Sequence, residues 1–224
     1  MKRFFITTSL ALLFTQCNPY KTFLSKEKQV EARKDYALRR GEYKTIADAM
    51  QLSNNDTVCD IGAGAGFSIS ILADFLPPST VYYEEDINQK LCNKQSFKNT
   101  FQFFQSNANI NQFRFYKGKD NKIPFADESF SNIVVFLCLH EFTKLPEMMQ
   151  ELKRILRNNG RLFILESVYR HTPITDPFCK LPYLSEKQVT ELIENNQLQI
   201  VKEIPVNENI KGENGYGRFM VCKK

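Results

Sequence analysis

Short apolar runs alternate with amphipathic segments from residue 57 to about residue 200. Apolar runs bounded by turn residues favour strands, and apolar residues spaced three and four apart favour helices. The predicted strands are 57–61, 80–83, 113–116, 130–139, 161–168, 198–204 and 216–222. The run "FSNIVVFLCL" at 130–139 is typical of a strand buried on both faces of a parallel sheet. No helix separates the last two strands, which predicts an antiparallel pair.

Helical spacing occupies most of the intervening segments. The predicted helices are 25–40 and 42–52, separated by Gly41, then 67–76, a stretch from about 88, 145–156, and a stretch after 185. Pro77 and Pro78 end the third of these, because proline cannot continue a helix. The "NNG" at 158–160 predicts the end of the helix before it. Ser185 and Gln188 have the spacing of a capping box.

This order of elements predicts an α/β fold with a doubly wound, Rossmann-like, mostly parallel sheet of seven strands and a C-terminal antiparallel strand. We divide the chain into a signal-like segment (1–17), covering helices (18–52) and a main domain (53–224). Ligands bind such sheets at the carboxyl ends of the strands.

The composition and charge limit the kinds of partner that the chain is expected to bind. The 224 residues are 42% hydrophobic and 25% charged, as in ordinary globular proteins. The net charge of +5 is spread along the chain without a Lys/Arg block, so nothing indicates nucleic acid. We expect a monomer or a weak oligomer.

The N-terminus resembles an export signal. Lys2 and Arg3 precede an apolar stretch at 4–14, which is too short for a membrane-spanning helix. The sequence "LLFTQCN" resembles the signal of a bacterial lipoprotein, with Cys17 as the lipid anchor, although Gln16 stands where a small residue is usual. The alternative is an N-terminal helix that packs on the domain or an uncleaved anchor. Location stays open between a membrane-anchored lipoprotein of the cell envelope and the cytoplasm.

The other five cysteines do not form a disulfide framework, since their number is odd and Cys59, Cys138 and Cys222 lie in apolar runs. Their spacing lacks a Cys-x-x-Cys pair, so we expect no metal site.

Three glycines follow the first predicted strand in "VCDIGAGAGFSIS" at 58–70. Gly62, Gly64 and Gly66 lie in a strand-to-helix turn, where the lack of a Cβ permits a sharp bend and close approach of a ligand. The dinucleotide pattern Gly-x-Gly-x-x-Gly would need a glycine at Phe67, so the spacing favours another ligand.

With Asp60 before it, this spacing resembles the first motif of the class I S-adenosylmethionine-dependent methyltransferases. "DINQKL" at 86–91 is similar to the second motif, and "IPFADESFSNIVVFLCLHEF" with "RILRNNGRLFILE" is similar to the later part of the family. The resemblance covers residues 44 to 168 and implies S-adenosylmethionine as cofactor. The implied cofactor-binding residues are Asp60, Gly62, Ala63, Gly64, Gly66, Glu85, Asp86, Ile87, Asp120 and Phe136.

Within that set, the resemblance makes Asp86 the acceptor for the ribose hydroxyls, with Glu85 as the alternative, and Ile87 the adenine contact. Lys119 stands where the family often has an acid for the adenine amino group, so Asp120 or a backbone group would serve. Phe136 stands where a small polar residue is common, and Ser131 replaces a usual Asp.

Methyl transfer is an in-line displacement that depends on alignment and exclusion of water. His140, with Glu141 beside it, is the candidate catalytic base, because its ordinary pKa lies near neutrality. The alternative is that "LHEF" only caps the strand and orients the next helix. Tyr36 and Tyr43 are candidates for the acceptor pocket or for packing, and His171 lies in a Pro-rich loop.

Three functions remain open. The first is an S-adenosylmethionine-dependent methyltransferase acting on a small or envelope-associated molecule. The second is a non-catalytic S-adenosylmethionine-binding protein of the same fold. The third is a nucleotide-dependent oxidoreductase, which Phe67 disfavours.

Overall fold

A single mixed sheet runs through the molecule. The computed structural model describes residues 26–176, 179–210 and 214–224. The strand order is β3-β2-β1-β4-β5-β8-β7, and the short β6 pairs with β5. The strands are β1 Thr57–Ile61, β2 Val81–Asp86, β3 Phe113–Lys117, β4 Phe130–Phe136, β5 Leu156–Tyr169, β6 Leu184–Ser185, β7 Gln199–Ile210 and β8 Gly215–Lys223.

Strands β1 to β5 pair in parallel, and β8 is antiparallel to both β5 and β7. The predicted α/β sheet and its antiparallel C-terminal pair are therefore confirmed. The sheet has eight strands where seven were expected, because Leu184 and Ser185 pair with Val168 and Tyr169. A two-residue strand is too short to leave a pattern of alternation in the sequence.

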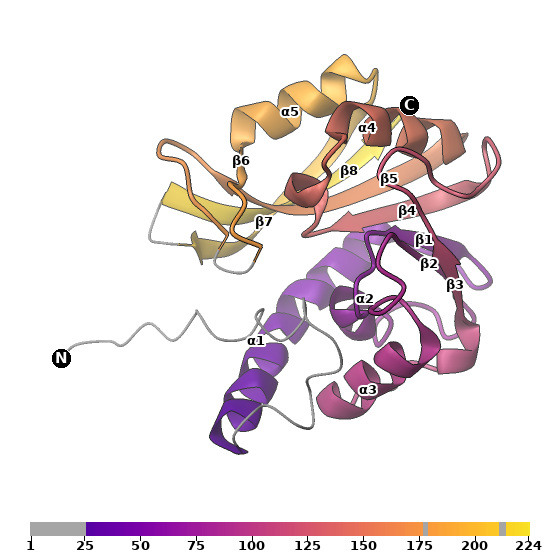
Figure 1. Ribbon diagram of the computed structural model, residues 1–224, viewed down its shortest axis with the longest axis vertical. Coiled ribbons are helices and arrows are strands. Elements are labelled where there is room, and N and C mark those ends of the chain that lie inside the picture. The colour runs from indigo at the N-terminus through magenta and orange to yellow at the C-terminus, as the bar shows by residue number, and fades with distance from the viewer. Residues whose placement is uncertain (1–25, 177–178, 211–213) are drawn as a thin grey trace.

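Helices cover both faces of the sheet, which gives three layers (Figure 1). Helices α1 Lys26–Met50, α2 Phe67–Leu72 and α3 Lys94–Phe104 lie on one face, and α4 Leu145–Ile155 and α5 Glu186–Asn195 lie on the other. Short 3-10 turns occupy Ile110–Gln112 and Leu139–Glu141. None of the described helices has the length and apolar composition needed to cross a bilayer. The predicted lipoprotein-like segment and Cys17 lie outside the described residues.

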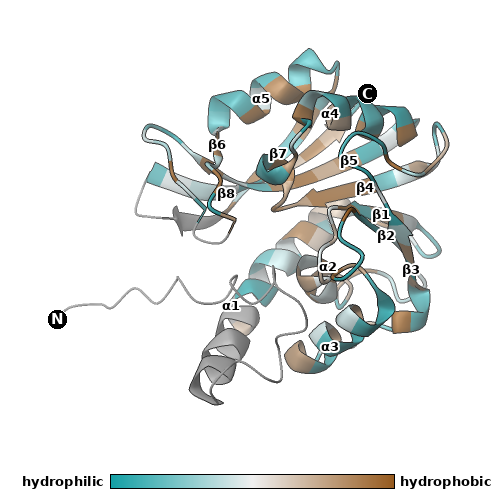
Figure 2. Cartoon of the chain, in the orientation of Figure 1, coloured by the Kyte–Doolittle hydropathy of each residue, from teal (hydrophilic) through white to brown (hydrophobic). Residues whose placement is uncertain are grey.

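The core consists of two apolar clusters, one on each side of the sheet. Val58, Val134 and Phe163 belong to the cluster beneath α1 to α3, and their chain neighbours Cys59, Ile133 and Ile164 belong to the one beneath α4 and α5. Successive residues of a strand point to opposite faces, so β1, β4 and β5 are buried on both sides. Figure 2 shows this as hydrophobic colour along the central strands.

The order of strands reverses at β1. The chain passes from β1 outward to β2 and β3, then returns to β4 on the other side of β1. Open α/β sheets bind ligands at the carboxyl ends of the strands beside such a reversal. The glycine turn follows β1 directly, so it lies at this point.

The N-terminal segment forms one helix, and the prediction of two helices was wrong. Helix α1 continues through Gly41, whose carbonyl accepts a hydrogen bond from the Thr45 hydroxyl at 3.2 Å. A glycine inside a helix costs about 1 kcal/mol relative to alanine. Burial of Tyr43, Ile46 and Met50 against the sheet offsets that cost.

Several other helix boundaries differ from the prediction. Helix α4 ends at Ile155, and "NNG" lies inside β5, where a Cβ on Gly160 would come within 3.1 Å of the Ser131 carbonyl. Helix α3 begins at Lys94 rather than near Asn88, because the Asn93 side chain caps it. Helix α2 ends at Leu72 and continues as turns to Leu76. The capping box of Ser185 and Gln188 is confirmed.

Candidate functional site

The three glycines of the turn after β1 have positive φ angles of 76°, 54° and 79° and two different roles. A Cβ on Gly62 would lie 2.6 Å from Cys138 Sγ, and one on Gly66 would lie 2.6 Å from the ring of Phe97. These two glycines let the turn pack closely against the protein itself. A Cβ on Gly64 would meet no atom within 4 Å, so the middle of the turn faces open space.

The end of β2 lies against this turn. The backbone N–H groups of Gly62 and Ala63 donate to the Glu85 carbonyl at 2.9 and 3.0 Å. The Asp86 carboxylate accepts the Gly64 N–H at 2.8 Å and the Asn88 N–H at 2.7 Å. Burial raises the pKa of Asp86, and these two N–H groups partly oppose the shift. Asp86 is thus fixed beside the open position of the turn.

The two other candidates at this edge differ in exposure. The Glu85 side chain is 2% exposed, and its Oε1 lies 1.3 Å from where a Cβ on Gly118 would be. Glu85 therefore packs over the backbone of Gly118, and burial raises its pKa to about 8. Ile87 is 59% exposed, an unusual position for a large apolar side chain, and it directly follows Asp86. An exposed apolar side chain beside an acceptor carboxylate suits a ligand with a flat apolar ring.

Asp60 lies opposite Glu84, its pairing partner in β2, beneath helices α1 to α3. Both side chains are buried, and no donor among the described residues reaches either carboxylate oxygen of Glu84. Burial raises the pKa of Asp60 to about 7, and burial together with Asp60 raises the pKa of Glu84 well above its usual value. Two facing carboxyl groups in such a place are stable when they share one proton.

The remaining predicted residues are dispersed. The Asp120 carboxylate is 3.3 Å from the Lys144 ammonium group in an ion pair. Phe136 is buried in the core, edge to face with the rings of Tyr43 and Phe219. The buried Tyr43 hydroxyl donates to Ser68 at 2.9 Å, which joins α1 to α2. Tyr43 is therefore a packing residue, whereas the side chain of Tyr36 lies outside what the structure describes.

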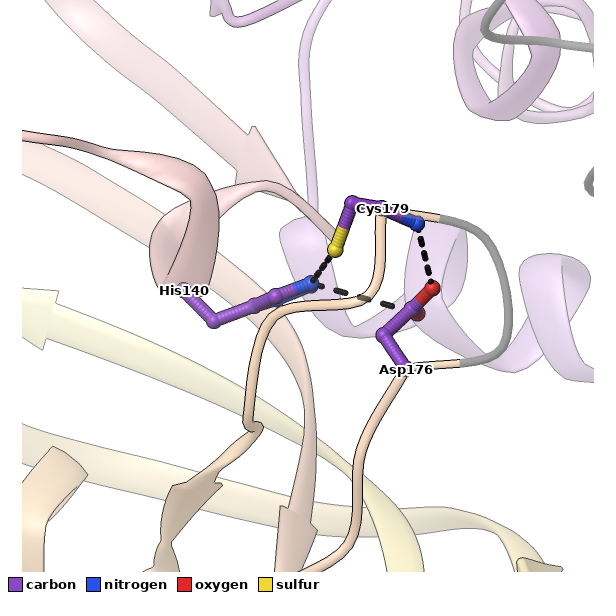
Figure 3. A group of neighbouring side chains, drawn as sticks. All are labelled: His140, Asp176 and Cys179. Atoms are coloured by element: carbon purple, nitrogen blue, oxygen red, sulfur yellow. Dashed lines mark hydrogen bonds and ion pairs between the residues drawn. The ribbon is translucent and has the colours of Figure 1, made fainter.

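His140 is the centre of a second group of polar side chains, drawn in part in Figure 3. The residue lies in the 3-10 turn after β4, and its side chain is 2% exposed. Its Nδ1 is 2.9 Å from Glu166, a fully buried carboxylate on β5, which also accepts the backbone N–H of His140 at 3.3 Å. The carboxylate fixes the ring so that Nε2 points away from the sheet.

Two side chains from the loop between β5 and β6 meet this Nε2 (Figure 3). Cys179 Sγ lies at 3.5 Å and Asp176 Oδ2 at 3.9 Å. Burial alone would lower the pKa of His140, but its hydrogen bond to Glu166 and the nearby carboxylates raise the pKa instead. Burial raises the pKa of Cys179 to about 11.

The loop that carries these two residues is held by backbone hydrogen bonds. Asp176 N–H donates to the Leu181 carbonyl at 2.8 Å, and Tyr183 N–H donates to the Ile174 carbonyl at 2.9 Å. Farther back along the loop, the Asn214 side chain accepts the backbone N–H groups of His171 and Thr172, both at 3.1 Å. His171 is exposed and takes no part in the His140 group that the structure describes.

Sequence reasoning missed four of these acids and thiols: Glu84, Glu166, Asp176 and Cys179. Glu166 interrupts the apolar run of β5, which indicates a buried carboxyl group, whereas Glu84 is the first of three consecutive acids that end β2 and does not stand out. Asp176 and Cys179 are three residues apart in a loop, and nothing in the surrounding sequence indicates a functional role for them. The cysteines expected to be buried, Cys59, Cys138 and Cys222, are free and buried.

The comparisons with known proteins identify the fold. Residues 59–164 match a family model described as "Methyltransferase domain". The chain has a methyltransferase fold. The matched domain contains the glycine turn, the acids of β2 and His140, whereas Glu166, Asp176 and Cys179 lie beyond it.

Curated methyltransferases are similar to this chain over part of their length. The uncharacterized methyltransferase YcgJ of Bacillus subtilis is 31% identical over 121 residues, 54% of this chain and 44% of the relative. The ubiquinone/menaquinone biosynthesis C-methyltransferase UbiE of Vibrio campbellii is 25% identical over 124 residues, 55% of this chain and 45% of the relative. The chain thus spans less than half of each of these two relatives.

Among solved structures, a SAM-dependent methyltransferase from Aquifex aeolicus superposes with a TM-score of 0.63. The superposition covers 88% of this chain and 98% of that one, at 19% sequence identity. At that identity, the similarity establishes the fold alone.

Proposed function

We propose that the protein is an S-adenosylmethionine-dependent methyltransferase that acts on a small or envelope-associated acceptor. The observation that carries the proposal is Gly64, the one glycine of the turn that faces open space, with the Asp86 carboxylate on its N–H group. A ligand can rest on the main chain there and reach a hydrogen-bond acceptor at the same time.

The residues at the turn fit the chemistry of the donor, which supplies a methyl group on a positively charged sulfur. Asp86 uses two of its lone pairs on N–H groups and retains others for the ribose hydroxyls. Ile87 offers an apolar surface for adenine. Asp60 lies two residues before Gly62 and Asp86 accepts the Gly64 N–H, and a cation nearby would favour the ionised forms of both.

Between the two acids left open by the sequence, the proposal assigns the ribose to Asp86. Glu85 faces Gly118 with a buried carboxyl group, and Asp86 faces the turn. Asp120 and Phe136 are engaged with Lys144 and with core rings, respectively, so we assign them no direct contact with the donor.

Calorimetry on the full chain tests donor binding. We expect S-adenosylmethionine and S-adenosylhomocysteine to bind and NAD not to bind. Gly64→Val should reduce the affinity for both adenosyl ligands at least 10-fold, because its side chain would occupy the open position. Gly41→Val in α1, where a Cβ also meets no atom within 4 Å, controls for the added side chain alone and should bind like the parent, whereas Gly64→Val also strains a backbone with a φ of +54°. Equal affinity in the two variants would contradict the site.

Asp86→Asn tests the acceptor role without adding volume. The loss of one charge-assisted hydrogen bond, worth about 1.5–3 kcal/mol, predicts an affinity decrease of about 10-fold to 150-fold. Turnover of a labelled methyl donor against cell extracts then separates an enzyme from a binding protein of the same fold. Binding without turnover would support the donor site and contradict the proposed methyltransferase activity.

The envelope location rests on the sequence of the N-terminus and is part of the proposal. Fractionation and lipid labelling of the parent chain and of Cys17→Ala provide the test. We expect the lipid label and the membrane fraction to be lost together in the variant. A soluble, unlabelled parent chain would instead indicate a cytoplasmic acceptor.

A further inference from the structure

The strongest unexplained feature is the group formed by His140, Asp176 and Cys179. One ligand atom from each residue lies within 4.8 Å of the other two. The three residues come from two separate parts of the chain, the turn after β4 and the loop after β5, which Figure 3 shows converging. Methyl transfer from S-adenosylmethionine needs neither a thiol nor a second carboxylate here. The group therefore requires another explanation.

We propose that these three side chains form a binding site for Zn²⁺. The donor set of one imidazole nitrogen, one thiolate and one carboxylate oxygen is suited to Zn²⁺, whereas Mg²⁺ and Ca²⁺ prefer oxygen alone. The charges also balance, because a thiolate and a carboxylate together neutralise the two positive charges of the ion. On binding, the thiol proton of Cys179 passes to solvent, since only the thiolate is a ligand.

The distances fit tetrahedral coordination. Zinc–ligand bonds of about 2.0–2.3 Å place neighbouring ligand atoms about 3.3–3.7 Å apart in a tetrahedron. His140 Nε2 is 3.5 Å from Cys179 Sγ and 3.9 Å from Asp176 Oδ2. The Cys179 and Asp176 ligand atoms lie within 4.8 Å of each other, and small rotations of these two side chains would close the remaining differences.

The surroundings hold the ligands in place. A histidine that binds a metal through one nitrogen usually donates its other N–H to a carboxylate, which fixes the ring and its tautomer. Glu166 occupies this position, 2.9 Å from Nδ1. The Asp176 carboxylate also accepts the Cys179 N–H at 3.0 Å through Oδ1, which leaves Oδ2 directed at the histidine.

The three protein ligands leave a fourth position, as in catalytic rather than structural zinc sites, and the half-exposed Glu141 carboxylate lies beside it, 4.0 Å from His140 Nε2. The site also adjoins the turn of the proposed donor site, because Cys138, two residues before His140, packs against Gly62. The open position suits a water molecule or an oxygen or sulfur atom of an acceptor. His140 cannot be a metal ligand and a free general base through the same Nε2, so this site replaces the predicted base.

Metal titration of the reduced full chain, without any methyl donor, tests the proposal independently of the proposed function. We expect one Zn²⁺ per chain in competition with a chromophoric chelator, and a thiolate-to-metal absorption band when Co²⁺ replaces Zn²⁺. Cys179→Ser and Asp176→Asn should each weaken binding at least 10-fold, and Cys179→Ser should abolish the thiolate band. Glu166→Gln should have a smaller effect, because its amide oxygen can still accept the Nδ1–H.

Matched controls exist for each ligand type. His171→Gln changes the other of the chain's two histidines, Asp48→Asn changes an exposed carboxylate on α1, and Cys92→Ala changes a cysteine in the other core cluster. All three should bind Zn²⁺ like the parent.

Alkylation gives a readout that does not depend on any variant. Cys179 is the half-buried cysteine among the described free ones, and Zn²⁺ should protect it from iodoacetamide in peptide mass maps. Failure to bind one Zn²⁺, or equal binding by the parent, Cys179→Ser and Asp176→Asn, would overturn the proposal.

Discussion

Replacing Glu84 by glutamine should stabilise the protein at neutral and alkaline pH. Glu84 and Asp60 face each other and are both buried, so ionising either carboxyl group requires an unfavourable loss of hydration. The substitution keeps the shape of the side chain and removes one ionisable group. The new amide can also donate an N–H to Asp60 at any pH, whereas the glutamate can donate only its carboxyl O–H, and only when it is protonated.

The size of the effect follows from the raised pKa. Asp60 has an ordinary pKa of 3.8, and burial raises it to about 7 in the folded protein. Each unit corresponds to about 1.4 kcal/mol, so folding stability falls by on the order of 4 kcal/mol as pH rises from about 4 to 7. Stability falls with rising pH because Asp60 loses its proton at a lower pH in the unfolded chain than in the folded protein. Glu84→Gln should flatten this decline and raise the unfolding free energy at pH 8 by about 1–3 kcal/mol.

Urea unfolding at several pH values between 5 and 8 measures both quantities. The chain contains no tryptophan, so far-UV circular dichroism is the suitable probe. Glu194→Gln, an exposed position on α5, removes the same charge at the surface and should have little effect. A Glu84→Gln variant that is less stable than the parent at pH 8, or that keeps the parent's pH dependence, would refute the reasoning.

Three further predictions concern the edge of the sheet. Gly118→Ala should lower the unfolding free energy by about 1–3 kcal/mol, because its methyl group would overlap the Glu85 carboxyl group; an unchanged urea midpoint would contradict this packing. Gly66→Ala should also lower the unfolding free energy, because its methyl group would overlap the Phe97 ring and its φ of +79° disfavours a side chain. Adding Phe97→Leu to this variant should restore part of the loss. Ile87→Ser should weaken S-adenosylmethionine binding in calorimetry with the melting temperature unchanged, since the side chain is 59% exposed; a lower melting temperature with full affinity would argue against an adenine contact.

The sheet was predictable because its sequence pattern is strong and local. The apolar run predicted as a strand at 130–139 forms β4 over Phe130–Phe136, because such a run is most stable in a strand with both faces buried, and its last residues turn away. Helix boundaries were less predictable, because tertiary contacts decide them. Gly41 stays helical because Tyr43 and Ile46 anchor the following turns, and Gly160 serves close packing in β5 rather than a helix end.

The site was predictable only where a motif is contiguous. The spacing of the glycines predicts the turn, but it does not tell which glycine faces open space. That distinction depends on Cys138 and Phe97, which are 76 and 31 residues away from the glycines they contact. His140 contacts Asp176 and Cys179 only because the loop after β5 folds back toward the turn after β4. The spacing of Asp176 and Cys179 in the sequence does not predict this contact.

Asn214 connects the last two strands to the loop that carries Asp176 and Cys179. Its side chain binds the start of the loop that ends beside His140, and it stands at the bend between the last two strands. Through this loop, the last two strands are connected to residues 59–164, the segment that matches the family model. A change in the final hairpin would therefore reach Asp176 and Cys179 through this loop and leave the hydrogen bonds between the glycine turn and β2 in place.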